Sequence, residues 1–178
     1  TAYREALTAY QLGSKSLQQS VMLAKMAVTL SEFSIVNDII DSLAYIYPDD
    51  PEILFIAARK ADNDKKLALA ASNYASVLKL APQNQENIYF YAKLLLNLNE
   101  ADSAQRILAK TSKNELSDRF LLLNAEVNYA NHDYDSAVFY YKKVLANRPD
   151  TAIYSKVMAI YAITNQGDSL INITKNAI

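Results

Sequence analysis

His132 is the only histidine of the chain, and imidazole can serve as a general base or as a metal ligand. Either function needs a second group, which is a nucleophile beside a base or further ligands around a metal. The sequence near His132 supplies no nucleophile and no second ligand at a recognised spacing. His132 lies between two helix-patterned segments, and histidine tolerates the left-handed backbone of a tight turn. We therefore interpret it as a turn residue.

Two aspartate pairs, Asp49 with Asp50 and Asp133 with Asp135, could suggest a divalent-cation loop. A calcium loop needs several oxygen ligands at alternating positions and usually a glycine at its sharp turn. Neither stretch has this pattern, whereas aspartate is common at helix N-caps and in turns. The chain also has no cysteine, so a thiolate metal site and a disulfide are excluded. We predict no metal and no cofactor.

The thirteen tyrosines raise the question of base stacking, as in single-stranded nucleic-acid binding. Interleaved basic residues are missing around them, and the formal net charge is −1. A general nucleic-acid binder is usually clearly basic, so we predict no nucleic-acid partner. No glycine-rich phosphate loop, nucleophile elbow or acid–base pair of carboxylates is present either, and we predict that the chain is not an enzyme.

Composition favours helix along nearly the whole chain. Of the 178 residues only two are glycine and four are proline, while 51% are hydrophobic and 21% are charged. These shares are ordinary for a globular protein, and the length suits one domain or one array of repeats. No apolar run reaches ~18 residues, so no membrane span is expected. The absence of cysteine suits cytoplasm and periplasm alike, and the start at Thr1 suggests a processed protein or a fragment.

The stretch 118–150 contains two helix-patterned segments joined by a tight turn. Ala125 lies in the first segment, Ala137 and Tyr141 lie on one face of the second, and Pro149 follows it. Small side chains let two antiparallel helices approach closely, and a ring four residues beyond Ala137 can fill the space beside them. Proline ends a helix and suits the first turn of the next.

This spacing, and the run NHDYDSAVFYYKKVLANRPD, resemble the tetratricopeptide repeat. Further copies contain matching residues, which are Ala58, Ala70, Tyr74 and Val77, then Ala92, Ala104 and Leu108, and finally Ala159. The resemblance implies an all-α fold, a right-handed superhelical solenoid of helix-turn-helix repeats. One array over 1–178 is then expected, with an extra helix at 1–13 and repeats at about 17–50, 51–84, 85–117, 118–151 and 152–178. The composition also favours a bacterial source.

The first and last repeats depart from the pattern. In the first, Val36 stands where alanine is expected, followed by Ile40 and Leu43 in the places of Tyr141 and Val144. In the last, Ala159 takes the place of Ala125, but Ile171 replaces the small residue of the second helix.

In this family the first helix of each repeat lines a concave groove. Three first helices of this chain would place a cation at one position facing that groove, and the fourth would place Glu126 there. Four residues earlier lies an apolar row that begins with Val21. The expected partner-binding residues are Lys25, Phe55, Arg59, Tyr89, Lys93, Leu122 and Glu126. An apolar row beside a cationic row suits a protein or peptide segment with hydrophobic anchors and acidic groups.

The alternative for the cationic row is an internal ladder of salt bridges. Glu52 and Glu86 open the second and third repeats, where they could reach Lys25 and Arg59. Exposed pairs contribute only about 0–1 kcal/mol each, so a ladder would not exclude a ligand. The sequence is compatible with both interpretations.

The resemblance implies a non-catalytic scaffold or adaptor module that binds a partner in its groove. The alternative function is self-assembly into homo-oligomers through the ends of the array, because uncapped repeats expose apolar surface.

Overall fold

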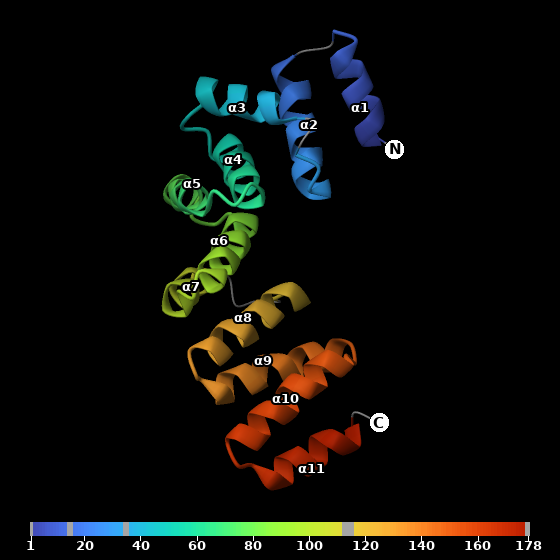
Figure 1. Ribbon diagram of the computed structural model, residues 1–178, viewed down its shortest axis with the longest axis vertical. Helices are drawn as coiled ribbons and strands as arrows, with labels where there is room; N and C mark the ends of the chain where they lie inside the picture. The colour runs from blue at the N-terminus through green and yellow to red at the C-terminus, as the bar shows by residue number, and fades with distance from the viewer. Residues whose placement is uncertain (1, 14–15, 34–35, 112–115, 177–178) are drawn as a thin grey trace. The chain divides into compact units, whose positions relative to one another are not determined.

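The computed structural model describes residues 2–13, 16–33, 36–111 and 116–176, which form helices joined by turns and contain no strand (Figure 1). The helices are α1 Ala2–Gln11, α2 Leu17–Leu30, α3 Asn37–Ile46, α4 Pro51–Asn63, α5 Leu67–Leu80, α6 Gln85–Asn97, α7 Ala101–Leu108, α8 Asp118–Ala130, α9 Tyr134–Asn147, α10 Thr151–Ile163 and α11 Gly167–Asn176. None of these helices, within the ranges described, is long and apolar enough to cross a membrane.

The chain folds into two compact units. The N-terminal unit, Thr1–Leu94, holds α1 to α5 and most of α6, and the C-terminal unit, Leu95–Ile178, holds the end of α6 and α7 to α11. In the N-terminal unit α4 packs against α5, and α2 packs against α1, α3 and α4. In the C-terminal unit α8 packs against α7 and α9, and α10 packs against α9 and α11. Each unit therefore has its own set of packed helices.

A residue in the left-handed conformation follows each of five helices at a nearly constant interval. These residues are Ser31, Lys65, Asn99, His132 and Asn165, spaced 34, 34, 33 and 33 residues apart. The backbone N–H of the residue after each of them donates to a carbonyl in the last turn of the preceding helix. For example, the Lys66 N–H donates to the Ala61 carbonyl at 2.8 Å. Such a bond satisfies an orphan carbonyl at the helix end. His132 has a φ of 61°, which confirms that it is a turn residue.

Small side chains let the paired helices pack closely, as the sequence predicts. Ala58 of α4 and Ala70 of α5 are completely buried, and so are Ala125 of α8 and Ala137 of α9. Tyr74 and Tyr141, four residues beyond the second alanine of each pair, are buried as well. Their rings fill the space that the alanines leave, so the aromatic residues at these positions belong to the core.

Aspartates cap three of the described helices, α4, α9 and α10, and two of these caps belong to the aspartate pairs considered above. The Asp50 side chain accepts from the backbone N–H groups of Glu52 and Ile53 at the start of α4. Asp133 accepts from the Ser136 N–H at 3.1 Å at the start of α9. These bonds confirm the interpretation of Asp50 and Asp133 as caps. Within the described ranges no cluster of three or more acidic or histidine residues could hold a metal ion.

The N-terminal elements follow the expected helices with one local difference. The extra helix expected within 1–13 is α1, and Gly13 after it has a φ of 113°, a conformation that favours glycine. In the next pair, Val36 is the N-cap of α3 and does not lie inside the helix. Its side chain is nevertheless completely buried, because the chain enters α3 against the apolar core of the N-terminal unit.

Two placements in the last repeat are wrong. Ala159 is exposed, unlike Ala125, and Ile171 is 57% exposed. The reason is the interval of 33 residues between His132 and Asn165, where the sequence alignment assumes 34. Met158 and Leu170 therefore stand in the inner places, and both pack against the core of the C-terminal unit.

Candidate functional site

The residues expected to face the groove lie on the first helices of the pairs. In the N-terminal unit Lys25 lies on α2, Phe55 and Arg59 on α4, and Tyr89 and Lys93 on α6. Lys25 and Lys93 are exposed, whereas the other three are partly buried. Leu122 and Glu126 lie on α8 in the C-terminal unit, and both are partly buried. Each unit thus carries its own set of the expected residues.

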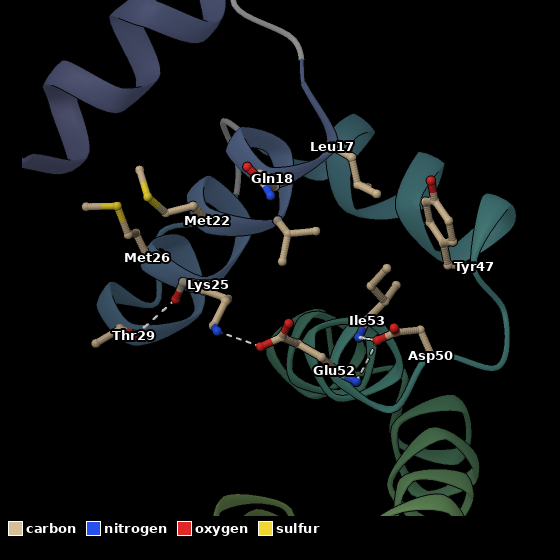
Figure 2. Close-up of a pocket in the computed structure, with 11 residues that line it drawn as sticks. Leu17, Gln18, Met22, Lys25, Met26, Thr29, Tyr47, Asp50, Glu52 and Ile53 are labelled. Carbon is tan, nitrogen blue, oxygen red and sulfur yellow. Dashed lines mark hydrogen bonds and ion pairs between the residues drawn. The ribbon is translucent and has the colours of Figure 1, made fainter.

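Lys25 forms the first salt bridge of the expected series, with Glu52. Its ammonium lies 2.5 Å from the Glu52 carboxylate, as Figure 2 shows. Both side chains are about half exposed, so the pair is screened by water and contributes little stability. The positive charge of Lys25 is largely neutralised by this partner.

Arg59 makes a different contact. Its guanidinium carbon lies 3.4 Å from the centroid of the Phe90 ring. Burial lowers the pKa of Arg59, against the opposing field of Tyr74, Asp62 and Glu86. Arg59 therefore has a packing contact that the sequence pattern did not indicate. The planar guanidinium stacks on an aromatic face, an arrangement that arginine favours and lysine cannot reproduce.

Phe55 and Tyr89 belong to a cluster of aromatic rings. The rings of Phe55 and Phe90 lie 6.1 Å apart, those of Phe55 and Tyr74 lie 6.3 Å apart, and those of Tyr89 and Phe90 lie 5.1 Å apart. Tyr91 extends the cluster by stacking on Tyr74 at 5.9 Å. The structure thus brings together the two predicted aromatic residues of the N-terminal unit, and it adds a buried tyrosine beneath them.

The sequence pattern missed Phe90 and Tyr91. Both stand beside Tyr89 in the run IYFYAK, but the alignment assigns only one residue per turn to the apolar row. Successive residues of a helix point about 100° apart, so Phe90 still reaches the neighbouring helix. The presence of three consecutive aromatic residues was the signal that could have indicated a wider aromatic surface.

Lys93 is an exposed cation of this row. No ion pair of Lys93 is found in the described part of the chain. Lys25, by contrast, is paired with Glu52. Lys93 and the stacked Arg59 therefore supply the positive charge of the N-terminal unit's surface.

A pocket of about 620 Å³ lies between α2 and the start of α4. Its lining includes the predicted residues Val21 and Lys25, and Figure 2 shows Met22 and Met26 on the side away from Tyr47. Methionine side chains are flexible and polarisable, which suits adaptable apolar contacts. Neither methionine was expected in the site, because neither belongs to the two aligned rows.

In the C-terminal unit the charge pattern is different. Glu126 accepts a hydrogen bond from the Lys156 ammonium of α10 at 2.9 Å. Burial alone would lower the pKa of Lys156, but the bond to Glu126 and the neighbouring Tyr141 together raise it above its ordinary value. Lys156 is thus held in its charged form. The acidic residue of the row is thus paired with a cation that the sequence pattern did not indicate.

A second pocket, of about 330 Å³, lies beside this ion pair. It is lined by Leu96, Glu126, Tyr129, Tyr141, Lys156 and Ala159, all within the C-terminal unit. Leu122, which was expected to provide the apolar anchor here, packs against the core and does not line the pocket. The aromatic surface of the pocket comes from the two tyrosines instead.

Lys60 forms a buried polar contact that the sequence pattern did not indicate. Only 8% of the residue is exposed, and its ammonium lies 3.0 Å from Asp41 and 3.6 Å from Asp64. Asp41 belongs to α3, so the contact ties α3 to α4. Lys60 is on another part of α4 from the groove row, and its pairing serves the packing of the helices.

The chain resembles known proteins both in its sequence profile and in its fold. Residues 64–123 match the sequence profile of the tetratricopeptide repeat. No curated protein sequence matches the chain. A tetratricopeptide repeat protein from Parabacteroides merdae superposes with a TM-score of 0.70 at 17% identity, covering 98% of this chain and 70% of the other.

Two further solved structures are similar. MamA from Desulfovibrio magneticus gives a TM-score of 0.76 at 13% identity over 90% of this chain and 92% of its own. YrrB, described as having an unusual peptide-binding site, gives 0.75 at 14% identity over 100% of this chain and 91% of its own. At these identities the likeness concerns the fold. It confirms the predicted all-α solenoid class, and the bacterial sources are consistent with the expected origin.

Proposed function

Because this chain contains tetratricopeptide repeats, we propose that it is a non-catalytic module that binds a peptide or protein segment on the first helices of its pairs. Proteins with this fold serve as scaffolds for protein–protein interaction, and the fold supports that general function here. The proposal adds a location and a ligand chemistry. The surface is the aromatic and cationic part of α4 and α6 in the N-terminal unit.

The stacking of Arg59 on Phe90, beside Phe55 and Tyr89, is the observation on which the proposal rests. Aromatic residues and arginine provide most of the binding energy at protein interfaces when they are held in place and shielded from water. Here the rings are packed against each other before any ligand arrives. A ligand would therefore lose less entropy on binding than it would on a mobile surface.

The charges of this surface favour a segment with acidic groups. Lys93 is exposed and unpaired within the described residues, and Arg59 carries a second positive charge nearby in the row. A ligand segment with a carboxylate beside an apolar residue would contact both these cations and the neighbouring aromatic rings. YrrB, one of the structural relatives, is described as having a peptide-binding site, which supports a peptide as the kind of ligand proposed for this chain.

Selection from a library of random peptides displayed on phage tests the proposal. The wild-type protein and two variants, Tyr89→Ala and Lys93→Glu, would be immobilised and used for parallel selections. We expect the wild type to enrich peptides with an aromatic or aliphatic residue near Asp or Glu. Tyr89→Ala should lose most of that enrichment, and Lys93→Glu should lose the acidic preference. Equal enrichment of the same peptides on all three proteins would rule out this surface.

Self-assembly is the second candidate function, and exposed apolar residues favour it. Ile171 of α11 is 57% exposed and Leu12 after α1 is 83% exposed. Apolar residues at the ends of a helical array can dock on another copy. Sedimentation velocity over a wide range of concentrations, with Ile171→Lys as the comparison, tests this candidate. A wild-type protein that stays monomeric at every concentration would exclude it.

A further inference from the structure

We propose that the pocket beside the Glu126–Lys156 pair is a second binding site, which takes one aromatic side chain of a peptide partner. The inference rests on the proposed function, because it takes the partner to be a peptide. It uses other residues, however, since all six residues that line the pocket belong to the C-terminal unit.

The pocket exists because the last repeat has a small residue at a position where the others have a long one. Counting six residues back from each left-handed turn residue gives Lys25, Arg59, Lys93, Glu126 and finally Ala159. The side chains of Lys25, Arg59 and Glu126 each reach a residue of the next first helix, whereas the alanine side chain occupies little space. Ala159 is correspondingly exposed and lies on the wall of the pocket.

The lining favours an aromatic group. Tyr141 is almost completely buried and forms one wall, and Tyr129 is 42% exposed beside it. Leu96 and Ala159 add aliphatic surface. A ring that enters this space can pack edge-on or offset against the two tyrosines. Such aromatic pairs are more favourable than the burial of their apolar area alone would make them.

The size of the pocket limits the ligand to a single side chain. Its volume is about 330 Å³, at the lower end of the range for small-molecule sites. One turn of α-helix with its side chains fills more than about 400 Å³, from its pitch and diameter. A helix therefore does not fit inside, while one aromatic ring does.

The ion pair at the pocket gives the ring a further contact without adding net charge. The Lys156 ammonium lies 5.7 Å from the Tyr141 ring and 2.9 Å from the Glu126 carboxylate. A ligand ring placed against Tyr141 would lie within reach of the same ammonium, which attracts aromatic faces. Because Glu126 balances that charge, the pocket should select for the ring and show no preference for an acidic group.

The experiment is an NMR titration of the full chain, observing backbone amides with three probes. The probes are N-acetyl-phenylalanine amide, N-acetyl-leucine amide and N-acetyl-glycine amide. We expect saturable shifts at Glu126, Tyr129 and Ala159 with the phenylalanine probe, at least fivefold weaker binding of the leucine probe, and no saturation with the glycine probe. Equal binding of the leucine and phenylalanine probes would overturn the aromatic assignment.

Two alanine variants locate the binding. Ala159→Leu places a branched side chain into the pocket and should abolish the saturable shifts. Ala162→Leu makes the same change at another exposed alanine of α10 and should leave them unchanged. Saturable shifts that persist in Ala159→Leu, or that disappear in both variants, would overturn the pocket as the site.

The two proposals can fail separately. Lys93→Glu lies outside the pocket, so it should not change the shifts caused by the phenylalanine probe. If peptide selection is unaffected by Lys93→Glu and Tyr89→Ala while the pocket titrates as expected, the N-terminal surface is rejected and the pocket is supported. If selection depends on those residues while no probe binds at Ala159, the pocket is rejected.

Discussion

The guanidinium carbon of Arg59 on α4 lies 3.4 Å from the centroid of the Phe90 ring on α6. This contact joins the first helices of two successive pairs inside the N-terminal unit. It also means that a residue assigned to partner binding takes part in the packing of the fold. Binding and stability are therefore expected to respond together when Arg59 is changed.

Replacing Arg59 with alanine should lower the free energy of unfolding by about 1–2 kcal/mol, because a partly desolvated cation–π contact and the packing of the side-chain stem are lost. Arg59→Lys should recover only part of this loss, because an ammonium does not stack as a planar group does. Urea denaturation followed by circular dichroism measures the difference. Lys93→Ala, a change at an exposed residue of the same row, is the control and should stay within about 0.5 kcal/mol. Equal midpoints for Arg59→Ala and Lys93→Ala would contradict the prediction.

Tyr74→Phe should stabilise the N-terminal unit by up to about 1 kcal/mol. The Tyr74 hydroxyl is buried, and no hydrogen-bond partner for it lies within the described part of the chain. A buried polar group without a partner costs free energy, and phenylalanine keeps the ring contacts with Phe55 and Tyr91. Tyr141→Phe is the matched control, because the hydroxyl of Tyr141 interacts with Lys156. Removing that hydroxyl should not stabilise the protein. Thermal unfolding of both variants gives the comparison, and a lower midpoint for Tyr74→Phe would show that its hydroxyl is satisfied.

Stability should also fall in alkaline solution. Burial raises the pKa of Tyr74 and of Tyr141 above the ordinary value for tyrosine. In the unfolded chain both phenols lose their protons near pH 10, so above that pH the unfolded state binds fewer protons than the folded state. The stability that comes from keeping these two buried phenols neutral is fully present below about pH 10. It is lost as the pH rises further. Urea titrations from pH 8 to the alkaline limit measure this slope, and Tyr74→Phe should reduce it. An identical slope in that variant would contradict the assignment to Tyr74.

The sequence predicted the parts of the fold that repeat. Ala58, Ala125 and Ala137 are buried, and His132 adopts the turn conformation, because each copy of the pattern strengthens the others. The last repeat was misplaced because a single residue is missing from the interval before Asn165, and a shift of one residue turns a helical side chain by about 100°. A periodic template cannot reveal such a shift unless the turn residue itself is recognised.

The candidate sites were predictable only in part. Lys25 and Glu52 were paired correctly from their positions in successive repeats. The stacking of Arg59 on Phe90 and the pairing of Lys156 with Glu126 depend on the direction in which long side chains turn, and residue spacing does not determine that direction. The pocket at Ala159 depends in addition on the corrected register, so it could not be found from the sequence.

Ala137→Leu tests the packing of α8 against α9. Ala137 is completely buried, and additional methylene groups in a close helix contact should destabilise the fold by about 1–3 kcal/mol. Ala159→Leu makes the same substitution at an exposed alanine and should change stability by less than about 0.5 kcal/mol. Thermal midpoints of the two variants check the assignment of the two alanines. A larger loss for Ala159→Leu than for Ala137→Leu would contradict the register described for the C-terminal unit.

Lys93→Glu should slow the association of an acidic peptide selected on the wild-type protein. Lys93 is exposed and unpaired among the described residues, so it acts on an approaching ligand over roughly one Debye length, about 10 Å at 0.1 M salt. Reversing its charge should reduce the association rate constant by about tenfold at low salt and flatten its dependence on ionic strength, with a smaller effect on dissociation. Surface plasmon resonance at several salt concentrations separates the two rates. Lys79→Glu is the matched control, because it makes the same change in net charge at an exposed residue of α5 in the same unit. If both variants slow association equally, the attraction comes from the overall charge of the protein, and Lys93 has no specific part in recognition.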